Sequence, residues 1–110
     1  MEIGCNTKTI VYENRTFLVN MLNFENGLIL SISENSLKIG PMLISISSGP
    51  VPSTSVIIPT KSEELFLKLL AEKISSFLNG ICVVTGNFEK PLDNETTKQL
   101  MHEIMGEIKQ

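Results

Sequence analysis

The chain has 110 residues, with 9 Lys plus Arg against 12 Asp plus Glu, and a formal charge of −3 at pH 7. This length fits one domain, so we expect a single domain over residues 1–110. Hydrophobic residues make up 42% of the chain and charged residues 19%, which excludes a disordered protein. The acidic balance argues against a nucleic-acid-binding domain and against electrostatic binding to a membrane surface, since both need a basic face.

The sequence shows no sign of export or membrane insertion. Its first residues lack the basic and apolar regions of a signal peptide. It also lacks a run of about 18 apolar residues that would span a bilayer. We therefore expect a cytoplasmic protein that also has access to the nucleus, in which Cys5 and Cys82 are reduced.

The first half of the chain has the composition and alternation of β-strands. Glu13-Asn14 is typical of a tight turn, and Asn26-Gly27 predicts a hairpin with a two-residue turn. That turn would place Phe24 opposite Ile29. The predicted strands cover residues 8–12, 15–24, 28–33, 42–47 and 53–58.

The second half changes to helical periodicity. Apolar residues at helical spacing predict helices over 63–78 and 94–109, with a short apolar strand at 81–85 between them. The strand is rich in β-branched residues, which favours a central strand buried on both faces. The predicted fold is α+β, an antiparallel six-stranded sheet in β-β-β-β-β-α-β-α order with two helices packed on one face.

Two helices on one face leave the other face of the sheet without a cover from this chain. Strand alternation and the predicted hairpin place Phe17, Val19, Met21, Leu28, Leu30 and Ile32 on the core face, because opposed residues point the same way. The other face carries polar residues together with Leu18, Leu22, Phe24 and Ile29. This mixture predicts a protein interface. The alternative is that a loop or the N-terminal segment covers the face.

The sequence offers little for catalysis or for cofactor binding. It has one histidine and two distant cysteines, too few for a clustered metal site built on nitrogen and sulfur. A nucleophile elbow and a glycine-rich phosphate loop are both absent. We therefore expect no enzyme, no metal and no cofactor, but a binding or scaffolding module.

One stretch is similar to a known family. Residues 42–47, the following loop and 51–57, with Pro52-Ser53-Thr54-Ser55 at the start of a strand, resemble the proteasome assembly chaperone 4 family. The likeness continues through the helix, strand, polar loop and helix of the second half. The related proteasome assembly chaperone 3 family has the same order of elements.

The resemblance implies a small sheet flanked by two helices that pairs through its sheet with a second small assembly chaperone. The dimer interface would then lie on the mixed face, at Leu18, Leu22, Phe24 and Ile29. An isolated chain of this type can also self-pair. The heterodimer would bind a proteasome α subunit and promote formation of the α ring of the 20S core, without ATP, metal or covalent chemistry. Loops carry function more often than regular elements do, so the expected contacts with the α subunit lie at Glu34 to Lys38 and at Phe88 to Asp93.

Two other functions fit a small sheet-and-helix domain. A scaffold of the roadblock or longin type also dimerises and serves trafficking or signalling, but a roadblock-like chain usually opens with a helix, whereas this chain opens with strands. An enzyme accessory subunit or small-ligand module would show a closed apolar pocket between the sheet and the helices.

Overall fold

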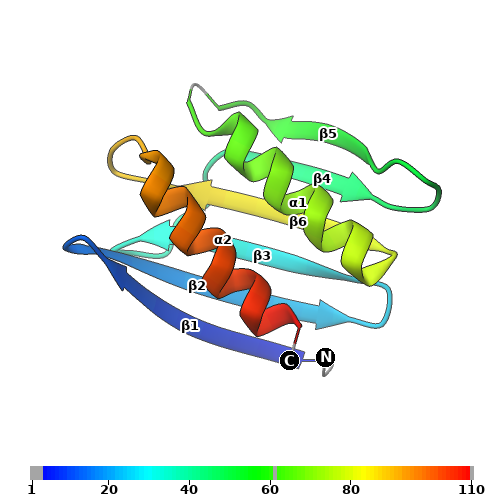
Figure 1. The fold of residues 1–110 in the computed structure, drawn as a ribbon, viewed down its shortest axis with the longest axis horizontal. Coiled ribbons are helices and arrows are strands. Elements are labelled where there is room, and N and C mark those ends of the chain that lie inside the picture. The colour runs from blue at the N-terminus through cyan, green and yellow to red at the C-terminus, as the bar shows by residue number, and fades with distance from the viewer. Residues whose placement is uncertain (1–3, 61, 110) are drawn as a thin grey trace.

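The strands and helices follow the predicted order. The computed structural model describes residues 4–60 and 62–109. Both helices lie on the same side of the sheet, as Figure 1 shows, which confirms the predicted layers. The elements are β1 (Gly4–Tyr12), β2 (Arg15–Phe24), β3 (Gly27–Glu34), β4 (Met42–Ile46), β5 (Ser53–Ile58), α1 (Glu64–Leu78), β6 (Ile81–Asn87) and α2 (Asn94–Ile108).

The sheet is mixed, and the prediction of a purely antiparallel sheet is wrong. Its strand order is β1-β2-β3-β6-β4-β5, and the pair β3–β6 is parallel while the other neighbours are antiparallel. β3 and β4 are joined by the long loop 35–41, so they do not pair with each other. β6 enters the space between them after the chain has passed through β4, β5 and α1. A parallel pair needs such a crossover connection, and here it supplies one of the helices that cover the sheet.

The two hairpins at the start of the chain differ in how well the sequence predicts them. Glu13 and Asn14 form the expected turn, with φ of 52° and 62°. The β2–β3 turn, however, uses Glu25-Asn26, so Phe24 lies opposite Gly27, and not opposite Ile29 as predicted. The shift is by two residues, so every side chain keeps its predicted face. A Cβ atom on Gly27 would collide with the carbonyl oxygen of Ile81 on β6, which explains the glycine within the strand.

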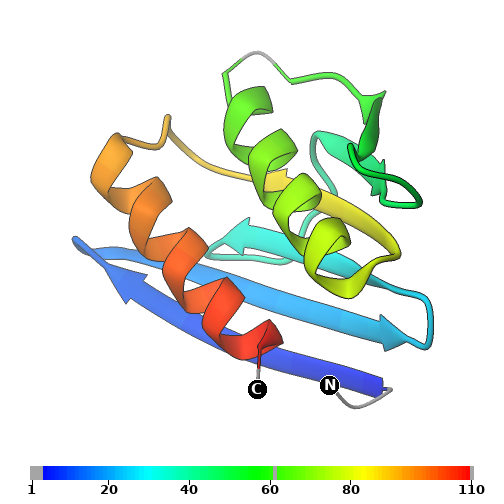
Figure 2. The ribbon, with the colours of Figure 1, turned by 45° about the vertical axis from the view of Figure 1, so that its right-hand side comes forward.

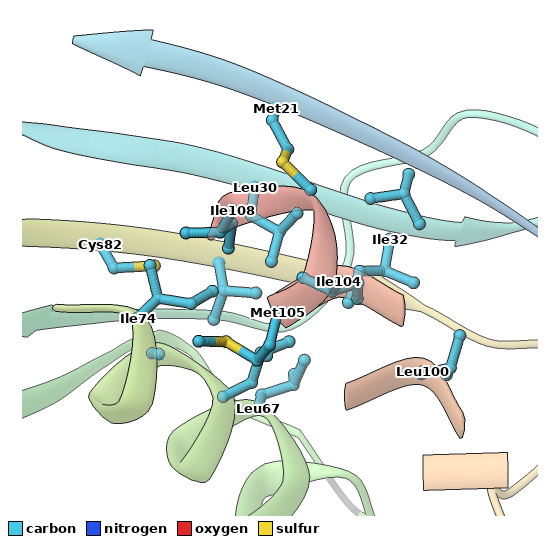
Figure 3. Packing of buried hydrophobic residues seen from close by; sticks show 14 of the residues in the cluster. Met21, Leu30, Ile32, Leu67, Ile74, Cys82, Leu100, Ile104, Met105 and Ile108 are labelled. Atoms are coloured by element: carbon cyan, nitrogen blue, oxygen red, sulfur yellow. The ribbon is translucent and has the colours of Figure 1, made fainter. Parts of the chain in front are cut away.

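The hydrophobic core lies between the sheet and the two helices. Figure 3 shows Met21, Leu30 and Ile32 of the sheet meeting Ile104 and Ile108 of α2. On the other half of the sheet, α1 packs over β4 and β6. The six residues predicted for the core face of β2 and β3 are all buried. Full burial of each such large side chain stabilises the fold by roughly 1.5–3 kcal/mol.

A buried ion pair closes one end of the core. Arg15 and Glu34 form two parallel hydrogen bonds, Nη2 to Oε1 at 2.7 Å and Nε to Oε2 at 2.9 Å. The Arg15 guanidinium also donates to the carbonyl oxygens of Lys90 and Pro91, and Glu34 accepts from the backbone N–H of Glu89. The hydrogen bonds from Arg15 lower the pKa of Glu34 below its ordinary value. The pair thereby ties the segment before α2 to the ends of β2 and β3.

Replacing Arg15 by Met should lower the free energy of unfolding by about 3–5 kcal/mol, because it leaves the Glu34 carboxylate buried without its partner. Urea denaturation of both proteins measures the change. The matched control is Lys98→Met, which breaks an exposed pair with Glu95 and should cost less than about 1 kcal/mol. A similar cost for both variants would contradict a structural role for the buried pair.

Candidate functional site

The face of the sheet opposite the helices is the candidate site, and we call it the outer face. Strand pairing aligns its side chains into rows that run across the strands. One row joins Leu22, Ile29, Val83 and Ile44 on β2, β3, β6 and β4. The next row contains Phe24, Ile81 and Ile46. These seven residues form what we call the apolar cluster.

Large side chains of the apolar cluster are open to solvent. Leu22, Phe24, Ile29 and Ile46 are each 41–45% exposed, whereas residues on the helix side of the same strands are buried. Ile81 and Val83 are half-buried, so β6 is sealed only on its helix side, contrary to the prediction of burial on both faces. None of the described residues of the chain covers the cluster from outside. It is therefore an exposed apolar patch on an otherwise folded sheet.

The other end of the outer face is polar and partly covered. Loop 35–41 is fastened to it by two side chains. The Ser33 hydroxyl donates to the carbonyl oxygen of Lys38, and the Thr85 hydroxyl donates to the carbonyl oxygen of Gly40. The alternative prediction, that a loop covers this face, is therefore correct for the polar end. The loop does not extend over the apolar cluster.

Charge is distributed unequally between the two faces of the sheet. The three charged residues in the described strands, Lys8, Arg15 and Glu34, all lie on the helix side. Lys8 forms ion pairs with Glu103 and Glu107 of α2, at 3.1 and 3.5 Å. Among its described residues the outer face therefore carries no charged side chain. A solvated sheet face ordinarily has charged residues, and interface centres are depleted of them.

The four residues predicted for the dimer interface all lie on the outer face. The register places Leu22 directly opposite Ile29, with Phe24 in the adjoining row. Leu18 is half-buried and lies nearer the polar end, opposite Ser33. Sequence reasoning missed the rest of the cluster, which comes from β4 and β6. The alternation of Met42, Ile44 and Ile46 on one side of β4 was visible in the sequence, but their neighbours depend on where β6 inserts.

The segment Pro52-Ser53-Thr54-Ser55 divides between the two faces of β5. The Thr54 hydroxyl donates to Glu72 Oε2 at 2.7 Å and its oxygen lies 3.3 Å from Ser45 Oγ, so it joins β5 to β4 and α1. Ser45 is in turn hydrogen-bonded to Ser75 of α1 at 2.9 Å. Ser53 and Ser55 are exposed on the outer face, opposite Ile46 and Ile44. Thr54 therefore holds α1 in place, and the two serines border the apolar cluster.

Replacing Thr54 by Val should lower the free energy of unfolding by about 1–3 kcal/mol, because Glu72 loses its hydrogen-bond donor and Ser45 loses a polar neighbour. Chemical denaturation measures the loss. Ser55→Ala changes an exposed residue on the same strand and should stay within about 0.5 kcal/mol of wild type. Equal effects of the two substitutions would show that the hydroxyl network contributes nothing.

Three of the four loop residues predicted to contact a partner are engaged in contacts within the chain. Glu34 is buried in its ion pair with Arg15. Phe88 packs edge-on against Phe17 and Phe66, with ring centroids 6.1 and 6.4 Å away. Asp93 caps α2 by accepting from the backbone N–H of Thr96, which lowers the pKa of Asp93.

Asp93 is exposed but engaged as the cap of α2, whereas Lys38 is exposed on a loop. Its neighbours Leu37 and Ile39 are 64% and 75% exposed. We call these three residues the loop tip. The loop is fastened at Ser33 and Thr85, so the tip projects from an anchored segment. It places two apolar side chains and one positive charge in solvent.

Cys82 of β6 is buried in the core. Burial raises the pKa of the Cys82 thiol to about 12, the reverse of what an activated nucleophile needs. Among the described residues, no cluster of three His, Cys, Asp or Glu forms a metal-binding group. The described helices include none long and apolar enough to cross a membrane.

Comparison with known proteins identifies the fold. No family model matches the sequence, and no curated protein matches it either. Among solved structures, the chain is similar to one from the crystal structure of a novel chaperone complex for yeast 20S proteasome assembly, with a TM-score of 0.68. The two chains share a fold. The match covers 98% of this chain and 99% of the other, at 11% sequence identity. The likeness therefore extends over the whole arrangement of strands and helices.

Proposed function

We propose that this chain is a non-catalytic assembly chaperone that pairs through its outer face with a second small chaperone and binds an α subunit of the proteasome. The observation that carries the proposal is the uncharged outer face with its exposed apolar cluster. The shared fold supports it, since the similar chain belongs to a complex for 20S proteasome assembly. We place this activity in the cytoplasm, with the nucleus as a second compartment.

Pairing would bring a second sheet over the apolar cluster. Sheets pack face to face at about 10 Å, a distance at which side chains from both inner faces interdigitate. Leu22, Phe24 and Ile29 are each a little over two-fifths exposed, and covering what remains would contribute about 1 kcal/mol apiece. Leu18, Ser53 and Ser55 lie around the cluster, where a partner would also reach them. The partner's own face would be equally uncharged, because a charge buried there without a counter-ion is costly.

The α subunit would be held by the loop tip. Leu37 and Ile39 supply apolar contact and Lys38 supplies a charge, so the tip favours a surface with an apolar hollow beside acidic groups. Such a small contact suits a transient complex, which forms while the α ring assembles and then gives way to a competing subunit. Neither ATP nor a cofactor takes part in this mechanism.

The double variant Leu22→Asp/Ile29→Asp should fold and lose its partner, because two negative charges on the outer face would be buried by pairing. Circular dichroism should match wild type, and size-exclusion chromatography with light scattering should show a monomer in the presence of the second chaperone. Leu30→Asp, on the buried side of β3, should unfold the chain and is the matched control. Unfolding of the double variant as well would show that the outer face belongs to the core.

Affinity capture of the tagged chain from cells of its own source tests the biological role. Mass spectrometry should recover free proteasome α subunits and a second small chaperone, without mature β subunits. The outer-face double variant should lose the second chaperone. Leu37→Ser/Ile39→Ser should keep that chaperone and lose the α subunit, because both side chains are exposed and away from the core. Recovery of small GTPases or trafficking proteins in their place would contradict the proposal and favour a scaffold.

A further inference from the structure

A second surface lies on the helix layer, on the opposite side of the molecule from the outer face. α1 and α2 run side by side in the same direction, as Figure 2 shows, and their N-terminal halves border a hollow of about 580 Å³. Phe66, Leu69, Leu92 and Met101 line it with apolar surface. Leu65 and Leu69, one turn apart on α1, are 69% and 49% exposed. We call this hollow the helix groove.

The charges that border the helix groove are mainly positive. Lys73 of α1 and Lys98 of α2 line it, in a chain whose net charge is −3 with its histidine neutral. Lys73 forms no ion pair with a described residue, and the contact of Lys98 with Glu95 is exposed and 3.9 Å long. An exposed pair of this kind is weak, so Lys98 is free to exchange partners.

The one carboxylate in the lining is already engaged. Glu63 Oε1 accepts from the Ser62 hydroxyl at 3.0 Å and from the backbone N–H of Leu92 at 3.4 Å. These bonds hold Glu63 at the end of the groove where α1 begins. The lysines lie further along, so the middle of the groove combines apolar lining with the charges of Lys73 and Lys98.

We propose that the helix groove binds a short, acidic, amphipathic helical segment of another protein. Two apolar side chains four residues apart on that segment would match Leu65 and Leu69, and flanking carboxylates would meet Lys73 and Lys98. From Leu65 to Lys73 the groove follows α1 for roughly 12 Å, the length of about two helical turns. This choice of occupant rests on charge complementarity, because a basic segment would be repelled by the same lysines.

The helix groove and the outer face are separated by the whole thickness of the sheet and the helix layer. Both can therefore be occupied at once, and the groove is independent of the proposed pairing. A chaperone with both surfaces would hold its dimer partner on one side and a segment of a client or a further factor on the other.

Fluorescence anisotropy with a labelled peptide tests the proposal directly. The probe is about twelve residues long, with two leucines at i and i+4 and glutamates on the opposite side. It should bind the full chain with micromolar affinity that weakens as salt increases. The matched peptide with lysines in place of the glutamates should not bind. Equal binding of the two peptides, or no binding of the acidic one, would overturn the proposal.

Variants of the chain locate the binding. Lys73→Glu/Lys98→Glu should weaken binding of the acidic peptide by about tenfold or more, because it reverses the charge of the groove. Lys68→Glu, at an exposed position of α1 outside the groove, should change it by less than about twofold and is the matched control. Leu22→Asp/Ile29→Asp should leave peptide binding unchanged. Loss of peptide binding in either control would place the site elsewhere.

Discussion

The packing of both helices against one face of a six-stranded sheet is the constraint on which the rest of the structure depends. α1 and α2 together bury the helix side of the strands, and the described residues leave the other side without a second layer. The three charged strand residues lie under the helices, where Lys8 meets the carboxylates of α2 and Arg15 meets Glu34. The outer face is left with apolar and uncharged polar side chains, the composition that an interface needs.

The Arg15–Glu34 pair links this arrangement to the loops. Desolvating two charges is costly, and the cost is offset here because the guanidinium and the carboxylate both find further hydrogen bonds on the segment from Glu89 to Pro91. That segment leads directly into Leu92 and the Asp93 cap of α2. The ion pair therefore sets where α2 begins and also where one wall of the helix groove stands.

The molecule presents different chemistry on its opposite sides. The described residues of the outer face include no charged side chain, which suits another sheet, whereas the helix groove is concave with lysines at its border. The loop tip adds a third exposed feature at the end of the sheet where loop 35–41 is fastened. The assembly role that we propose would use separate surfaces of this kind, because the chain would hold one subunit while remaining bound to its own partner. Weak, independent contacts also allow each partner to leave separately.

The sequence by itself determined the elements and the faces, because both follow from local periodicity. Alternation in β2 and β3 assigned every residue to the correct side even though the register was wrong by two residues. Only the tertiary structure decided the parallel β3–β6 pair, the contribution of Ile44 and Val83 to the apolar cluster, and the burial of Glu34. Each of these joins segments far apart in the chain, and no local pattern encodes which distant strand, loop or charge a residue meets once the core has closed.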